Sequence, residues 1–92
     1  MIISFRHKGL RIFYESGSTK GIRADHAKRL GRMLSLMDRA REPADLDIPG
    51  WRLHPLKGER EEFWSLMVNG NWRVIFRFVG NDIELVDYLD YH

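Results

Sequence analysis

The spacing of hydrophobic residues changes about half-way along the chain, from the period of a helix to the alternation of a strand. Between residues 24 and 41, hydrophobic side chains recur every three or four positions, which predicts an amphipathic helix ending before Pro43. The recurring residues are Ala27, Leu30, Leu34 and Met37, with Met33 and Ala40 beside them. Residues 7–15 repeat the pattern more briefly and predict a shorter helix.

The second half of the chain alternates hydrophobic and polar residues. Strands are predicted at residues 63–68, at 72–78 and from Asp82 onward, separated by turns at Asn69-Gly70 and Gly80-Asn81. Two further extended segments are predicted at residues 2–5 and 51–56, and Pro55 indicates that the second lies at a sheet edge or ends there. The order β-α-α-β-β-β-β predicts one α+β domain over residues 1–92, a small antiparallel sheet with two N-terminal helices packed on one face.

Alternation within residues 72–78 divides that strand between the two faces of the sheet. One set is expected to form the core beneath the helices, and the other places two guanidinium groups on the open face. The core set is Trp72, Val74, Phe76 and Phe78, and the open set is Arg73, Ile75 and Arg77. An open face is often polar for solubility alone. The pattern is therefore compatible both with a solvent-exposed face and with a face that binds anions.

Composition narrows the function classes. The chain has no cysteine, which excludes disulfides, thiol nucleophiles and thiolate metal sites. It shows no signal-peptide pattern and no membrane-spanning run, so a cytoplasmic location is expected. The net charge of +2 is unevenly spread, because residues 1–41 hold ten Lys and Arg against three acids and residues 42–92 hold five against ten. A basic half suits a phosphate backbone or an acidic protein partner, and an ordinary solvated helix face stays an alternative.

Three separate segments carry side chains suited to cutting RNA without a cofactor or metal. Histidine transfers protons near neutral pH, and lysine and arginine stabilise the charge that develops on a phosphate. Aspartate can orient an imidazole, and tyrosine can stack on a base. The candidate residues are His54, Lys57, Arg73, Asp90, Tyr91 and His92, which are expected to meet in one cleft on the open sheet face.

Other interpretations of these residues stay open. For His54 and His92 taken singly, a structural role is the simpler interpretation, and Asp90 with His92 could belong to a metal site, although no further metal-ligand spacing supports one. His7 and His26 are interpreted as surface residues of helices. Residues 17–21 are glycine-rich and contain a lysine but lack phosphate-loop spacing, so a connecting loop is predicted.

Several short runs together resemble the HigB branch of the RelE/ParE toxin superfamily. They are Ile3 to Leu10 at the start, Leu53-His54-Pro55-Leu56-Lys57-Gly58, Trp64-Ser65, Asn71-Trp72-Arg73 and the ending Asp90-Tyr91-His92. The resemblance covers nearly the whole chain and implies a RelE-like fold. It also implies a bacterial toxin of a type II toxin–antitoxin pair that cuts messenger RNA in the ribosomal A site. On the matched positions, the six candidate residues would form the active site.

The resemblance further implies a helix-turn-helix antitoxin of the HigA kind, and repression of the shared operon through operator DNA. Arg73 would stabilise the scissile phosphate with help from Lys57, and the histidines would share proton transfer and positioning with Asp90. Basic residues on the exposed side of the helices and sheet would bind the phosphates of RNA, including ribosomal RNA. These RNA-binding candidates are Lys20, Arg23, Lys28, Arg29, Arg32 and Arg77. The alternatives are a ParE-like toxin acting on DNA gyrase and a plain interaction module.

Overall fold

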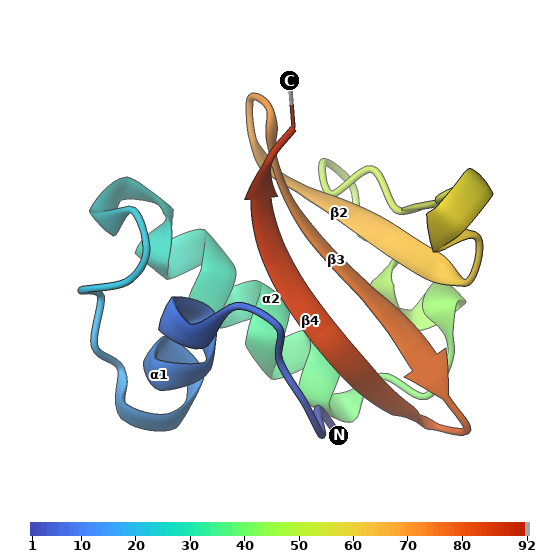
Figure 1. The fold of residues 1–92 in the computed structure, drawn as a ribbon, viewed down its shortest axis with the longest axis horizontal. Helices are drawn as coiled ribbons and strands as arrows, with labels where there is room; N and C mark the ends of the chain where they lie inside the picture. The colour runs from blue at the N-terminus through green and yellow to red at the C-terminus, as the bar shows by residue number, and fades with distance from the viewer. Residues whose placement is uncertain (92) are drawn as a thin grey trace.

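The computed structural model describes residues 1–91, as two helices beside a four-stranded antiparallel sheet of order β1-β2-β3-β4 (Figure 1). The helices are α1 (Lys8–Ser16) and α2 (Ala27–Arg39), and the strands are β1 (His54–Pro55), β2 (Phe63–Asn69), β3 (Trp72–Val79) and β4 (Asp82–Asp90). Short 3-10 turns are η1 (Ala24–His26), η2 (Pro43–Leu46) and η3 (Gly58–Arg60). The α+β architecture predicted from the sequence is confirmed. No helix within residues 1–91 is long and apolar enough to cross a membrane.

The N-terminal segment differs from the strand predicted for it. Residues 2–5 make only two isolated bridges, Ile2 to Ile83 and Phe5 to Val86, both parallel to β4. The segment therefore covers one edge of β4 without joining the antiparallel ladder. His7 also differs from the surface helical residue predicted for it. It is half-buried and caps α1, because its Nδ1 accepts a hydrogen bond from the Leu10 N–H (2.9 Å).

Helix α2 buries the stripe that its sequence predicts. Leu30, Met33, Leu34 and Met37 are buried against the sheet. The helix ends at Arg39, where Ala40 turns to an extended backbone, so it stops earlier than predicted. The loop before it packs onto α1 backbone to backbone at two glycines, where a Cβ atom on either one would collide with the other; these are Gly9 and Gly21.

Cross-strand register defines the two faces of the sheet. Leu66, Val68, Val74 and Phe76 point into the main core between the sheet and α2. On the opposite face, one row crosses all four strands, because His54 pairs with Ser65, Ser65 with Ile75, and Ile75 with Asp87. A second row joins Met67, Arg73 and Leu89, and a third joins Phe63, Arg77 and Glu84.

Strand β4 contains a bulge that its sequence does not reveal. The register with β3 shifts between Ile75 and Arg77, and Leu85 adopts φ of 56°, the left-handed region that costs a leucine about 1–2 kcal/mol. Ser4 holds the bulge, because its Oγ accepts the Leu85 N–H at 2.9 Å. The extra residue leaves Glu84 and Asp87 on the open face while Val86 and Tyr88 face the core.

His26 is buried, contrary to the surface position expected from the sequence. Its side chain is 3% exposed, and its Nδ1 lies 2.6 Å from the Tyr88 hydroxyl. The Trp72 ring packs edge-on to the imidazole at 5.5 Å and lies 4.6 Å from the Tyr88 ring. Burial lowers the pKa of His26 from its ordinary value of 6.5, because the charged imidazolium loses its hydration.

The buried imidazole predicts a pH-dependent stability. Because the pKa of His26 is lowered in the folded chain, the unfolded chain binds a proton first as pH falls below about 6.5. The free energy of unfolding should therefore decrease as pH drops below that value, by at most about 1.4 kcal/mol per pH unit, and level off below the folded-state pKa. Urea unfolding between pH 5 and 7.5 measures this slope.

His26→Gln keeps a hydrogen-bonding group and removes the titration, so its slope over this interval should be shallower. The matched control is His54→Gln, which makes the same substitution at an exposed position. Equal slopes for wild type and His26→Gln would contradict the assignment.

Candidate active site

The open face of the sheet carries two of the residues predicted from the sequence, His54 and Arg73. His54 is exposed on the edge strand β1, and its Nδ1 lies 3.0 Å from the Arg52 carbonyl oxygen. A carbonyl only accepts hydrogen bonds, so Nδ1 carries the proton and Nε2 of the neutral ring is left as an acceptor. Arg52 itself has φ of 51°, a strained conformation of the kind found beside functional sites.

Arg73 is held by the backbone of the β2–β3 hairpin. Its Nη1 donates to the carbonyl oxygens of Gly70 (2.6 Å) and Trp72 (3.0 Å), and the side chain is half-buried. Among residues 1–91, no carboxylate forms an ion pair with it. Carbonyl oxygens fix the direction of a guanidinium group without cancelling its charge. Arg73 therefore presents a fixed positive charge on the open face.

Tyr91 lies just beyond β4 and is held by its backbone. Its N–H donates to the Asn71 carbonyl oxygen at 2.7 Å, and the side chain is 45% exposed. The guanidinium carbon of Arg60, in η3, lies 6.0 Å from the centroid of the Tyr91 ring. Arg60 does not stand out in the sequence as a site residue, because it lies among four other charged residues and its partner is 31 positions away. Lys57 is exposed immediately before η3.

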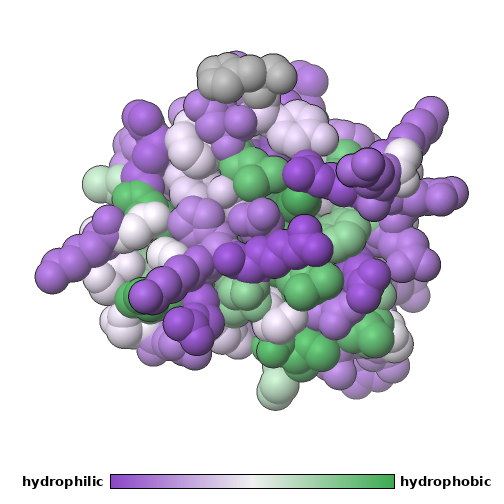
Figure 2. All heavy atoms as spheres, viewed as in Figure 1, coloured by the Kyte–Doolittle hydropathy of each residue, from purple (hydrophilic) through white to green (hydrophobic). Residues whose placement is uncertain are grey.

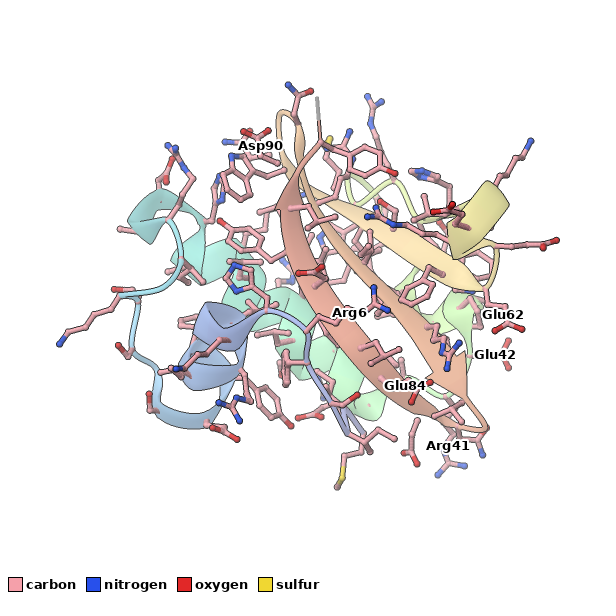
Figure 3. All side chains as sticks on the ribbon, in the orientation of Figure 1. Arg6, Arg41, Glu42, Glu62, Glu84 and Asp90 are labelled. Carbon is pink, nitrogen blue, oxygen red and sulfur yellow. The ribbon has the colours of Figure 1, made fainter. Side chains whose placement is uncertain are left out.

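Asp90 does not share this face, which corrects the single cleft expected from the sequence. It pairs with Trp72 in the β3–β4 register, and this places its side chain on the face of Trp72 and Tyr88 (Figure 3). There it lines a hollow of about 300 Å³ with Arg23, Asp25 and His26 among its neighbours. Alternation along β4 is the cause, since Leu89 and Asp90 must point to opposite faces. His92, the remaining candidate, lies outside the described residues.

Comparison with known proteins gives the same family as the sequence motifs. The profile of the HigB-like toxin family, described as RelE-like toxin of type II toxin-antitoxin system HigB, matches residues 3–92. The chain belongs to this family. It is 44% identical over 92 residues to the protein named endoribonuclease HigB of Proteus vulgaris, and the match covers all of both chains. It is 35% identical over 94 residues to toxin HigB-1 of Vibrio cholerae, covering all of this chain and 98% of the relative.

The basic residues predicted to bind RNA fall into two groups in this HigB-like chain. Three have structural partners. Arg23 pairs with Asp25 at 3.1 Å, Arg77 pairs with Glu84 at 2.6 Å, and Arg29 donates to two backbone carbonyl oxygens. The other three are exposed in or near α2, namely Lys20, Lys28 and Arg32.

Side chains suited to metal binding are not clustered in the described part of the chain. No three His, Asp or Glu side chains among residues 1–91 are grouped to hold an ion. The pair Asp90 and His92, considered from the sequence as part of a metal site, includes a residue outside that range.

Arg29 is expected to stabilise the fold of the HigB-like chain. Its Nη2 donates to the carbonyl oxygens of Gly50 (2.8 Å) and Met67 (3.1 Å), tying α2 to the segment before β1 and to β2. Arg29→Ala should lower the free energy of unfolding by about 2 kcal/mol, since it removes the charged donor from the partly buried Met67 carbonyl and from the exposed Gly50 carbonyl. Urea unfolding measures this loss.

The matched control is the neighbouring Lys28→Ala, at an exposed position of the same helix, which should change stability by less than about 0.5 kcal/mol. Similar effects of the two substitutions would show that the Arg29 contacts contribute nothing to stability.

Proposed function

We propose that the protein is an endoribonuclease toxin that cuts messenger RNA in the ribosomal A site. The observation that supports this most directly is Arg73, a guanidinium group fixed on the open face by two carbonyl oxygens and without a carboxylate partner among residues 1–91. Such a group suits the extra negative charge that a phosphate carries as it is attacked. The name of the Proteus vulgaris relative, endoribonuclease HigB, supports the same reaction.

The proposed chemistry is attack of a ribose 2′-hydroxyl on the adjacent phosphorus. The 2′-oxygen loses its proton to a base and forms a bond to phosphorus, while the bond from phosphorus to the 5′-oxygen breaks and that oxygen gains a proton. His54 and His92 share the two proton transfers, and the free Nε2 of neutral His54 can accept one. Arg73, helped by Lys57, stabilises the phosphorane, so no metal ion takes part in the step.

Tyr91 and Asp90 have different proposed roles because their side chains have different surroundings. The exposed ring of Tyr91, oriented beside Arg60, stacks on a base of the bound strand. Asp90 is a positioning residue that acts from the helix face, near Arg23 and Trp72, and orients the end of the chain.

The proposed partners follow from family membership. A type II toxin has an antitoxin, which we propose to be a HigA-like helix-turn-helix protein that represses the shared operon at its operator DNA. The ribosome would deliver the messenger RNA, which places the action in the cytoplasm. The exposed residues Lys20, Lys28 and Arg32 would contact ribosomal RNA through its phosphates.

Cleavage on ribosomes tests the proposal. Purified toxin, freed of antitoxin, should cut a defined messenger RNA bound to 70S ribosomes and leave a 2′,3′-cyclic phosphate. Arg73→Gln should lower the single-turnover rate about 10²–10³-fold, the usual loss when one donor to a developing oxyanion is removed. The exposed control Arg11→Gln, in α1, should keep the wild-type rate.

A messenger RNA with a single 2′-deoxynucleotide at the cut position should resist cleavage. Cutting of that substrate would refute 2′-hydroxyl attack. If no messenger RNA were cut and gyrase-dependent DNA breaks appeared, the ParE-like alternative would replace the proposal.

The position of Asp90 predicts an unequal effect of two substitutions. Asp90→Asn should reduce the cleavage rate less than Arg73→Gln does, because its carboxylate lies across the sheet from the proposed phosphate site. The comparison uses the same single-turnover assay on ribosomes. A loss as large as that of Arg73→Gln would place Asp90 among the groups that contact the reacting atoms.

A further inference from the structure

The open face of the sheet contains a small apolar layer that is covered by arginine side chains. Phe63 and Ile75 are buried but lie outside the main core cluster. The guanidinium carbons of Arg6 and Arg77 lie 5.4 Å and 5.8 Å from the centroid of the Phe63 ring. Figure 2 shows hydrophobic residues interspersed with charged ones on the side viewed there. The two arginines therefore shield Phe63 from water with their stems and present their charge outward.

These two arginines differ in their charge partners. Arg77 forms ion pairs with Glu84 (2.6 Å) and Glu62 (3.3 Å), which neutralise it. Arg6 is exposed and, among residues 1–91, makes no ion pair with a carboxylate. Arg6 thus contributes to the open face a positive charge that no ion pair among residues 1–91 neutralises.

The position of Arg6 is fixed before any ligand arrives. Its backbone N–H donates to the Val86 carbonyl oxygen at 2.8 Å, directly after the segment that covers the edge of β4. From there its side chain reaches across the sheet toward Phe63 (Figure 3). Because the guanidinium group already rests on a ring, binding an anion costs it little conformational freedom.

We propose that Arg6 binds a phosphate of the RNA strand on the open face, some nucleotides away from the bond that is cut. This inference rests on the proposed function. The Phe63–Arg77 row beneath Arg6 is four residues from Arg73 along β3, about 13 Å at the usual rise of a strand. A single strand of RNA spans that distance in a few nucleotides.

The two acidic residues of this face, Glu84 and Asp87, have partners within the sheet. Glu84 is paired with Arg77, and the Asp87 Oδ1 accepts the Tyr88 N–H at 2.9 Å, which fixes that carboxylate against the backbone and leaves its negative charge in place. The strand would run from Arg73 to Arg6, and its phosphates would pass to the side of the Asp87 carboxylate, which lies in the row between them.

Salt dependence of RNA binding tests the inference. The probe is a fluorescent ten-nucleotide single-stranded RNA, and anisotropy gives its dissociation constant over a series of KCl concentrations. Each phosphate contact to a single strand contributes about 0.7 to the slope of log K against log[salt]. Arg6→Met keeps an unbranched cover over Phe63 and removes the charge, so its slope should be smaller by about 0.7. Arg6→Lys should restore the wild-type slope.

The same variants are compared for cleavage on ribosomes. Arg6→Met should raise KM severalfold and leave kcat within about twofold, as expected when binding is lost equally in the ground and transition states. The control Arg11→Met, an exposed arginine of α1, should match wild type in slope and in KM. Thermal unfolding shows whether each variant is folded.

Different results would overturn the two proposals separately. A wild type that cuts messenger RNA, combined with equal salt slopes for Arg6→Met and Arg11→Met, would refute the role of Arg6 alone. An Arg6-dependent slope in a protein that cuts no RNA would refute the proposed function alone. Weakened antitoxin binding by Arg6→Met with unchanged RNA binding would assign the residue to the protein partner and overturn the inference.

Discussion

The end of β4 depends on how Tyr88 is anchored. Its hydroxyl lies 2.6 Å from Nδ1 of the buried His26, and its ring packs against Trp72 at 4.6 Å and His7 at 5.2 Å. One side chain thus joins the turn before α2, the start of α1 and the first residue of β3 to the last strand. Because Asp90 and Tyr91 follow within three residues, this buried contact helps to hold the end of β4, together with the register with β3 and the Tyr91 N–H bond to the Asn71 carbonyl oxygen.

The bulge at Leu85 makes that anchoring possible. Without the extra residue, strict alternation would place Glu84, Val86 and Tyr88 on one face of β4. The bulge instead sends Glu84 to the open face, where it pairs with Arg77, and keeps Tyr88 in the core. The strained backbone of Leu85 is maintained by the Ser4 hydroxyl and by the parallel bridges of the N-terminal segment. The first residues of the chain therefore control which face the last ones use.

Much of the fold could be predicted from the sequence, because helix and strand periods are local properties. The stripe of α2, the hairpin at Asn69-Gly70 and the open-face position of Arg73 all follow from spacing. The burial of His26 could not be predicted, since its partner is 62 residues away. The face on which Asp90 lies could not be predicted either, because it depends on the register between β4 and β3. For the candidate site, sequence identifies the residue types, and tertiary contacts decide which of them meet.

The arginines of this protein show how a fold separates structural charge from charge that is available for binding. Where a carboxylate fixes the guanidinium group, as Glu84 fixes Arg77, the pair stabilises the sheet and cancels its own field. Arg73 is fixed by carbonyl oxygens and Arg6 by an aromatic ring, and both interactions orient the group while leaving its net charge intact. A polyanionic strand is attracted by charge that is not cancelled, and it is bound with least entropic cost where that charge is already oriented. The interaction that holds each arginine therefore distinguishes structural charge from charge available for binding better than exposure does. Arg73 and Arg77, for example, are both half-buried on the same face of the sheet.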